Sequence, residues 1–256
     1  MKQLEGKIAF ITGAAMGMGK GIAQVMAERG ATVLLADIDP EVENTAAEIG
    51  SAAHSYLLDI SDEKAVEQLG AEILSQYGHV DILVNNAGIL RPIDPFKMDS
   101  SLRDFHYRVN VCGCWNCTRA FFPKMLERKY GRVVNLSSVT GPKVADPGMV
   151  GYAMSKGAIL GMTKALAMDG VDRGVTVNAI LPGYVHTHMV ERTASLERPD
   201  DPDSFLRDIC ARLPMGRMAD PKEVGYLAAF LASDEAAYIT GGEFVIDGAN
   251  GLVETH

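Results

Sequence analysis

The stretch Thr12-Gly13-Ala14-Ala15-Met16-Gly17-Met18-Gly19 decides the fold of this 256-residue chain. It follows an apolar run, Lys7–Thr12, that is typical of a buried strand, and a helical pattern begins at Gly17. Glycine also makes plain turns, but here its missing Cβ would let the main chain approach a ligand at a helix N-terminus. Free N–H groups and the helix dipole favour a pyrophosphate there. The turn therefore predicts a nucleotide-binding βα unit.

The rest of the chain repeats this alternation of short apolar runs and longer helical patterns. Strands are expected at Lys7–Thr12, Thr32–Ala36, Ser55–Leu58, Ile82–Asn85, Arg132–Ser137, Thr176–Leu181 and Phe244–Ile246. Helices are expected near Gly17–Arg29, Glu41–Ile49, Asp62–Tyr77, Ser101–Arg128, Tyr152–Asp172 and Pro221–Ala232. This order predicts one α/β domain over residues 1–256, a Rossmann-type doubly wound fold with mainly seven parallel strands and helices on both faces.

One stretch, from about residue 186 to residue 218, departs from this alternation of strands and helices. It carries Pro199-Asp200-Asp201-Pro202 and several charged residues. An insertion of this length in a compact domain is usually a lid or a binding loop. We expect it to cover the substrate.

Composition excludes some classes of function. The hydrophobic share of 47% is enough for a sizeable core, and the net charge of -9 argues against a nucleic-acid partner. No apolar run approaches the roughly 18 residues of a membrane-spanning helix, and the first residues show no signal-peptide pattern. A cytoplasmic protein with neither nucleic acid nor membrane as partner is expected.

The second strand ends in an acid, Asp37, which lies 18 residues beyond Gly19. This is close to the spacing of a carboxylate that binds the adenosine ribose hydroxyls. Such a carboxylate would repel the 2′-phosphate of NADP, and neither Ala14–Met16 nor Ile38 supplies a cation for that phosphate. The pattern favours NAD over NADP. The alternative is that Asp37 only begins a turn and caps the next helix.

Tyr152-Ala153-Met154-Ser155-Lys156 places a phenol and an ammonium on one face of a helix. A free tyrosine has a pKa of about 10, and a nearby cation lowers it by favouring the phenolate. Such a tyrosine could exchange a proton with an alcohol or a carbonyl. Alone, this spacing is more often a surface pair, but Asn135–Ser138 and Asn178–Gly183 end neighbouring strands at the edge where ligands bind.

With these residues in view, the chain resembles a single-domain, NAD-type short-chain dehydrogenase/reductase over essentially its whole length. The resemblance rests on six motifs in order, which are Gly13/Gly17/Gly19, Asn85-Asn86-Ala87-Gly88, Asn110, Ser138, Tyr152/Lys156 and Pro182-Gly183-x-x-x-Thr187. It implies four catalytic residues. Ser138 would hold the substrate oxygen, Tyr152 would exchange the proton, Lys156 would bind the nicotinamide ribose and tune Tyr152, and Asn110 would hold a relay water.

The resemblance also implies how the cofactor is held. Asp59 and Ile60 would contact adenine, the Asn86–Gly88 loop would line the adenosine side, and Val185 and Thr187 would hold the carboxamide. The residues expected to bind NAD are Gly13, Met16, Gly17, Met18, Gly19, Asp37, Ile38, Asp59, Ile60, Asn86, Ala87, Gly88, Tyr152, Lys156, Pro182, Gly183, Val185 and Thr187.

Two departures from the family pattern stand out. Ser138 and Tyr152 are one residue further apart than is commonest, and choosing Ser137 would enlarge the discrepancy. Ala249 stands where a second glycine is usual, after Gly248.

No metal is expected. Cys112, Cys114 and Cys117 lie close together, but at about 100° per residue the first two point to nearly opposite faces of a helix. His186 and His188 lack helical ligand spacing, so we interpret them as polar residues at the mouth of a cleft.

Small residues recur along one helix at Ala153, Gly157, Gly161 and Ala165. Such a row lets another backbone approach closely. It serves either packing on the chain's own sheet or a subunit interface, and the resemblance favours an interface and a homotetramer.

The expected activity is hydride transfer between NAD(H) and a secondary alcohol or carbonyl compound, as in an alcohol dehydrogenase or carbonyl reductase. One alternative is a 3-oxoacyl-carrier-protein reductase, because Arg128, Lys129 and Arg173 could meet an acidic carrier protein. Such enzymes resemble NADP users, however, and Asp37 opposes NADP. A non-catalytic NAD-binding sensor is the other alternative. The motifs do not define the substrate.

Overall fold

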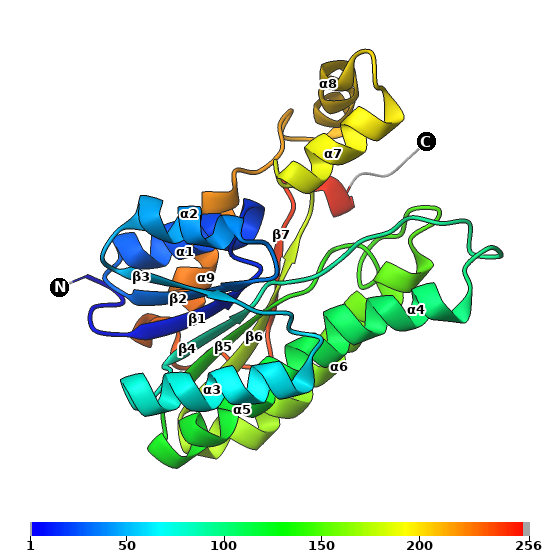
Figure 1. Cartoon of the computed structure of the whole chain (residues 1–256). Helices are drawn as coiled ribbons and strands as arrows, with labels where there is room; N and C mark the ends of the chain where they lie inside the picture. Colours follow the sequence, from blue (N-terminus) through cyan, green and yellow to red (C-terminus); the bar gives the residue numbers. More distant parts are fainter. Residues whose placement is uncertain (1, 253–256) are drawn as a thin grey trace.

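The computed structural model describes residues 2–252, which contain one parallel sheet in the order β3-β2-β1-β4-β5-β6-β7 (Figure 1). The strands are β1 (Ile8–Thr12), β2 (Thr32–Asp37), β3 (Ala53–Leu57), β4 (Ile82–Asn85), β5 (Gly131–Leu136), β6 (Val175–Pro182) and β7 (Glu243–Ile246). The strand order reverses between β1 and β4, and ligands of such sheets bind outside the carboxyl ends at this switch point. The predicted Rossmann-type fold is confirmed.

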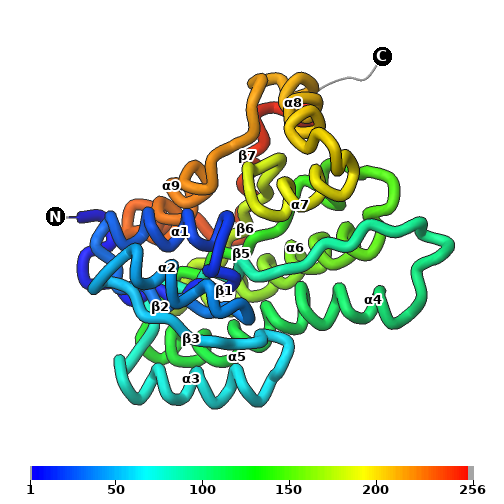
Figure 2. The backbone as a smooth tube through the Cα atoms, turned by 45° about the horizontal axis from the view of Figure 1, so that its top comes forward, coloured from blue at the N-terminus to red at the C-terminus, as the bar shows by residue number. Residues whose placement is uncertain are grey.

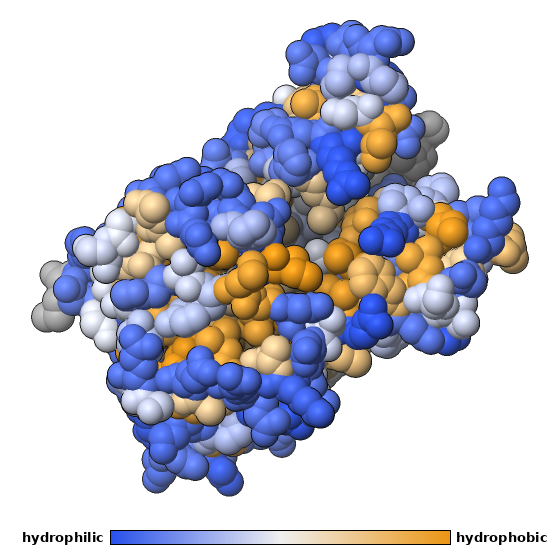
Figure 3. Space-filling model, in the orientation of Figure 1, coloured by the Kyte–Doolittle hydropathy of each residue, from blue (hydrophilic) through white to orange (hydrophobic). Residues whose placement is uncertain are grey.

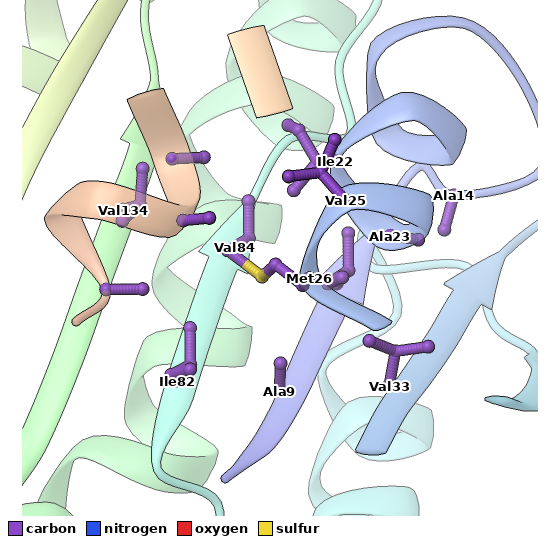
Figure 4. Packing of buried hydrophobic residues seen from close by; sticks show 14 of the residues in the cluster. Ala9, Ala14, Ile22, Ala23, Val25, Met26, Val33, Ile82, Val84 and Val134 are labelled. Atoms are coloured by element: carbon purple, nitrogen blue, oxygen red, sulfur yellow. The ribbon is translucent and has the colours of Figure 1, made fainter. Parts of the chain in front are cut away.

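Helices cover both faces of the sheet (Figure 1). One layer holds α1 (Gly17–Glu28), α2 (Glu41–Ile49) and α9 (Pro221–Leu231), and the other holds α3 (Glu63–Tyr77), α5 (Cys114–Arg128) and α6 (Val150–Gly170). Two apolar cores result, one on each face. Figure 4 shows Ile22 and Met26 of α1 packed over Val84 of β4. Each such side chain contributes about 1.5–3 kcal/mol when fully buried, which explains the near-continuous apolar strands.

The helix expected at Ser101–Arg128 runs without a break, but it is not α-helical throughout. The structure has α4 (Ser100–His106), then a π-helical segment, Tyr107–Gly113, and then α5. A π-turn bonds residue i to i+5 and so accommodates an extra residue, which apolar periodicity cannot reveal. The π-segment carries Asn110.

The segment predicted as a lid forms two helices, α7 (His188–Glu197) and α8 (Pro202–Arg212), that stand apart from the sheet in both views (Figures 1 and 2). They pack chiefly on each other. Arg198 joins them through an ion pair with Asp208 at 2.6 Å. Short 3-10 turns lie at Val171–Arg173, Asp234–Ala236 and Asn250–Leu252. Across residues 2–252, every helix is too short or too polar to cross a bilayer.

Candidate active site

The glycine-rich turn brings main chain close to main chain. Gly13 and Gly17 have φ of +66° and +56°, in the left-handed region. A Cβ on Gly19 would lie 1.9 Å from the Gly13 carbonyl oxygen, so this position requires glycine. Met16 begins α1 without a side-chain cap, which leaves the N–H groups of the first turn open to an anion.

The Asn86–Gly88 loop is fastened to this turn. The Asn86 amide Nδ2 donates to the carbonyl oxygens of Thr12 and Gly13 at 2.9 and 3.0 Å. The Thr12 hydroxyl accepts from the main-chain N–H groups of Asn86 and Ala87, each at 3.1 Å. The other amide atom, Asn86 Oδ1, is buried and has no hydrogen-bond partner. An unpartnered acceptor beside an uncapped helix start fits a dinucleotide that supplies hydroxyl or amino donors.

Asp37 at the end of β2 turns back toward the same turn. Its Oδ2 accepts from the Ala15 N–H at 2.9 Å, and its Oδ1 accepts from the Asp39 N–H at 3.0 Å. The next side chain, Ile38, is exposed. The carboxylate keeps further lone pairs for ribose hydroxyls.

The two residues expected at the adenine lie differently from each other. Asp59 is exposed, and its Oδ1 accepts from the Ser61 N–H at 2.8 Å. The Ile60 side chain is buried, and a Cβ on Gly113 would lie 2.5 Å from its Cδ1. The Ile60 carbonyl accepts from Asn116 Nδ2 at 3.0 Å. Ile60 can therefore reach a ligand only through its main chain.

Ser138 and Tyr152 come together despite their unusual spacing. Ser138 follows β5, Tyr152 lies in the first turn of α6, and their hydroxyls are hydrogen-bonded. Burial raises the pKa of Tyr152 above its ordinary value, and the hydrogen bond from Ser138 offsets this only in part. The expected lowering of this pKa by Lys156 is therefore wrong for the protein's own groups, because desolvation of the phenolate outweighs them.

Ser137 is committed elsewhere, since its hydroxyl donates to the Lys156 carbonyl at 2.9 Å. This contact, together with that of Ser138 to Tyr152, supports the choice of Ser138 over Ser137.

Lys156 is buried close to the tyrosine. Its Nζ lies 5.6 Å from the centre of the Tyr152 ring and donates to the Leu136 carbonyl at 2.8 Å. Burial lowers the pKa of Lys156 to about 8. A Cβ on Gly88 would lie 3.4 Å from this Nζ and 3.2 Å from Asn110 Oδ1. The Asn86–Gly88 loop therefore brings Lys156 and Asn110 to a common point.

Asn110 connects the π-segment to this point. Its Oδ1 accepts from the Ile89 N–H at 2.7 Å, and its Nδ2 donates to the Ile89 carbonyl at 3.0 Å. The same Nδ2 donates to the Ser155 hydroxyl at 2.9 Å, and Ser155 donates to the Tyr152 carbonyl at 2.7 Å. Sequence reasoning missed Ser155 and Thr12. Their positions within a matched motif were the only available signal.

The Pro182–Thr187 segment returns to the phosphate turn. A Cβ on Gly183 would lie 2.7 Å from the Asp247 Cβ, so glycine allows the close approach at the end of β6. Val185 is buried and bridges to Ala219. The Thr187 methyl lies 3.3 Å from where a Cβ on Gly17 would stand. Residues expected at opposite ends of the cofactor thus border one cleft.

Figure 3 shows this cleft as a hollow below α7 and α8 with mainly apolar side chains along its edge. His186 and His188 lie on its α7 side, 3.7 and 3.5 Å from the Glu191 carboxylate. Cys114 and Cys117 are buried and Cys112 is exposed, as the helical spacing indicated. Within the described part of the chain, no cluster of three His, Cys, Asp or Glu side chains could hold a metal ion.

The sheet, its switch point and the side chains gathered there define an oxidoreductase of the dinucleotide-binding type. A family model described as enoyl-(acyl carrier protein) reductase matches residues 13–249. The chain belongs to the short-chain dehydrogenase/reductase family, whose Rossmann domain generally binds NAD or NADP.

Individual relatives agree with this assignment. The chain is 48% identical to the oxidoreductase UcpA of Salmonella typhimurium, over 100% of this chain and 98% of the relative. It is 37% identical to the 3-oxoacyl-[acyl-carrier-protein] reductase FabG of Thermotoga maritima, over 98% and 99% of the two chains. The aldohexose dehydrogenase of Thermoplasma acidophilum has the same fold, with a TM-score of 0.92 at 28% identity over 100% and 98% of the two chains.

Proposed function

We propose that the chain is an NAD(H)-dependent dehydrogenase or reductase acting on a secondary alcohol or the corresponding carbonyl compound. The observation that carries this proposal is the contact between the Ser138 and Tyr152 hydroxyls with Lys156 beside them. Two hydroxyls directed at one point can bind and deprotonate a single substrate oxygen. A protein that only bound the dinucleotide would not need this arrangement, which argues against a non-catalytic sensor.

The nicotinamide, when bound, accepts the hydride that leaves the alcohol carbon. Ser138 holds the substrate oxygen by a hydrogen bond and orients it toward the tyrosine. Tyr152 takes the hydroxyl proton as a general base, and in the reverse direction it returns the proton to the carbonyl oxygen. Because the protein alone raises the pKa of Tyr152, the added positive charge of the oxidised nicotinamide is needed to favour the phenolate.

Lys156 and Asn110 complete the proton path in this proposal. Lys156 binds the nicotinamide ribose, and its Nζ lies 5.6 Å from the centre of the Tyr152 ring. Asn110 lies next to Lys156 across Gly88 and holds the water that joins Lys156 to solvent. Ser155 links Asn110 to the main chain of Tyr152 and fixes the distance between them.

NAD is the proposed dinucleotide. Both oxygens of the Asp37 carboxylate are held by main-chain N–H groups, so the negative charge stays where a 2′-phosphate would lie. Ile38, the following residue, offers no cation.

A 3-oxoacyl-carrier-protein reductase is the second candidate, favoured by the FabG relatives. Arg128, which would bind the acidic carrier protein, already forms an ion pair with the buried carboxylate of Asp81 at 3.2 Å. It is therefore only partly available to a carrier protein. Turnover of an acetoacetyl thioester with NADH and with NADPH separates the candidates: NADPH-linked reduction supports the carrier-protein enzyme.

The test of the proposed function is NAD reduction by a panel of secondary alcohols, sugars and hydroxy acids, together with a titration of NADH binding. We expect NADH to bind and at least one alcohol to reduce NAD. Failure of NADH to bind would contradict the proposal.

We also propose that the protein is a homotetramer. Gly157 and Gly161 are exposed, and a Cβ on either would meet nothing within 4 Å, so this row does not pack on the chain's own sheet. Exposed apolar side chains of the same helix lie beside it in sequence, namely Met154 and Met168. A second apolar surface lies at the sheet edge formed by β7, with Val245 and Tyr238 exposed. Two separate self-contacting surfaces generate a tetramer. The cytoplasmic location stays a prediction.

A further inference from the structure

Residues 89–93, which we call the strap, run without regular secondary structure from the Asn86–Gly88 loop toward α4. Pro92 has no N–H, and three of the remaining four N–H groups of the strap are held by other segments. Ile89 donates to Asn110 Oδ1 at 2.7 Å, Arg91 to His106 Nε2 at 3.2 Å, and Ile93 to the Gly148 carbonyl at 3.0 Å. The strap is thus fixed at every second residue.

His106 is the one strap anchor that can change its hydrogen-bonding character. It is fully buried, at 0% exposed. Its Nδ1 lies 3.0 Å from the Leu102 carbonyl, which can only accept, and its Nε2 faces the Arg91 N–H, which can only donate. The ring is therefore the neutral tautomer with the proton on Nδ1. Both ring nitrogens are used, and both partners are main-chain groups.

The strap and its His106 anchor each lie next to a segment that carries a proposed catalytic side chain. It begins after Gly88, where a Cβ would lie 3.4 Å from Lys156 Nζ. Toward its other end, the His106 ring lies against Gly151, where a Cβ would come within 3.1 Å of Nδ1. Gly151 directly precedes Tyr152 in α6. The strap therefore begins beside Lys156, and its His106 anchor lies against the turn of α6 that carries Tyr152.

We propose that His106 is a positioning residue, which fixes the strap through Arg91 and so shapes the substrate side of the cleft. This inference rests on the proposed function only for its expected effect on KM. Asn110 binds Ile89, which directly follows the loop expected to contact the cofactor. His106 binds Arg91, two residues further along the strap. Loss of the His106 acceptor leaves the Arg91 N–H unpaired while the Ile89 contacts persist. Substrate binding is thus the step that depends on His106.

A matched pair of substitutions tests the proposal. In His106→Asn the amide reaches the position of Nδ1 and can bond only Leu102, whereas in His106→Gln the amide oxygen reaches the position of Nε2 and can accept from Arg91. Hydrogen exchange of single amides is measured in the protein without substrate. We expect Arg91 to exchange about tenfold faster in His106→Asn, with His106→Gln near wild type and Ile89 unchanged in both.

Kinetics supply the second readout. For a substrate found in the alcohol panel, we expect KM to rise roughly three- to tenfold in His106→Asn with kcat changed less than about twofold, and both to recover in His106→Gln. NADH affinity is expected to stay unchanged, as it should in the surface control His54→Gln. Equal behaviour of the Asn and Gln variants, or unchanged Arg91 exchange in His106→Asn, would overturn the proposal.

A measurement on the unmodified protein guards against misfolded variants. The ¹⁵N shifts of the His106 ring report its tautomer, and a proton on Nε2 would contradict the arrangement. If no alcohol reduces NAD, the proposed function fails, whereas the exchange and tautomer experiments still decide whether His106 holds the strap.

Discussion

Asp37 and Ala15 are joined by a 2.9 Å hydrogen bond from the Ala15 N–H to the Asp37 carboxylate. The acid at the end of β2 is therefore tied to the turn between β1 and α1, and it cannot swing away from a ligand placed there. A fixed negative charge opposes a second one placed beside it.

Asp37→Ala removes this charge, and we expect the preference for NAD over NADP, as a ratio of kcat/KM values, to fall by at least about tenfold. Asp39→Asn is the control, because the Asp39 side chain accepts a hydrogen bond from the Glu41 N–H and the variant keeps that acceptor. An unchanged ratio in Asp37→Ala would show that another residue selects the dinucleotide.

Tyr152→Phe keeps the ring and removes the proposed proton carrier. We expect turnover to fall by about 10²–10⁴-fold, the usual contribution of a positioned acid or base, while NADH binds nearly as before. NADH fluorescence titration and single-substrate kinetics measure the two effects. Tyr226→Phe, on the exposed side of α9, should keep full activity. Activity retained in Tyr152→Phe would refute the assigned role.

The buried ammonium of Lys156 should destabilise the folded protein when no cofactor is bound. Its pKa is about 8 in the folded chain and 10.5 ordinarily, so at neutral pH burial of the ammonium costs the folded state about 3 kcal/mol. The cost is constant below pH 8 and disappears as pH rises from 8 toward 10.5, because there only the unfolded chain keeps the proton.

Lys156→Met is accordingly expected to be inactive yet more stable than the wild type at pH 7, by about 1–3 kcal/mol after the lost hydrogen bond to Leu136 is counted. The advantage should shrink between pH 8 and 10.5. Urea unfolding at a fixed protomer concentration measures it. A variant less stable than the wild type at pH 7 would mean that neighbouring groups stabilise the Lys156 ammonium by more than its burial destabilises it.

Ala249 has a φ of +67°, a left-handed conformation that disfavours a residue with a Cβ. Replacing it with glycine should raise the free energy of unfolding by about 0.5–1 kcal/mol, the relieved strain being partly offset by the greater freedom of glycine in the unfolded chain. Thermal and urea unfolding check this. Ala47→Gly on the exposed side of α2 should lower stability by about the same amount. If Ala249→Gly and Ala47→Gly lower the free energy of unfolding equally, the backbone at Ala249 is not strained.

Gly161→Glu places a charge in the exposed row on α6, and we expect it to reduce the mass of the particle in light scattering from a tetramer to a smaller species. Ala47→Glu adds the same charge on exposed α2 and should not. A monomeric mass for the wild type at micromolar concentration would refute the tetramer itself.

The fold could be predicted from sequence because its signals are local. The glycine turn marks β1 and α1, and the apolar runs correspond to the seven strands, with only small shifts such as β3 beginning at Ala53 instead of Ser55. Ser138, Tyr152, Lys156 and Asn110 carry recognisable motifs, and the structure brings them to one end of the sheet.

Features that depend on packing could not be predicted in this way. The raised pKa of Tyr152 follows from its burial, which the Tyr-x-x-x-Lys spacing does not encode. The π-segment at Tyr107–Gly113 has the same residue types as a regular helix. Ser155 acts through the distant Asn110 side chain and His106 through the main chain of Arg91, and nothing in their own neighbourhood of the sequence indicates those partners.

The π-segment also restricts how the chain can vary in length. Deleting one residue between Tyr107 and Gly113 would let the segment become an ordinary α-helix, and the π-turn that carries Asn110 would be lost. Asn110 would then lose its contacts with Ile89 and Ser155 even though both residues were retained. Insertions and deletions should therefore be tolerated in the exposed turn between α7 and α8 but not here, where the length of the segment sets the direction of the Asn110 side chain.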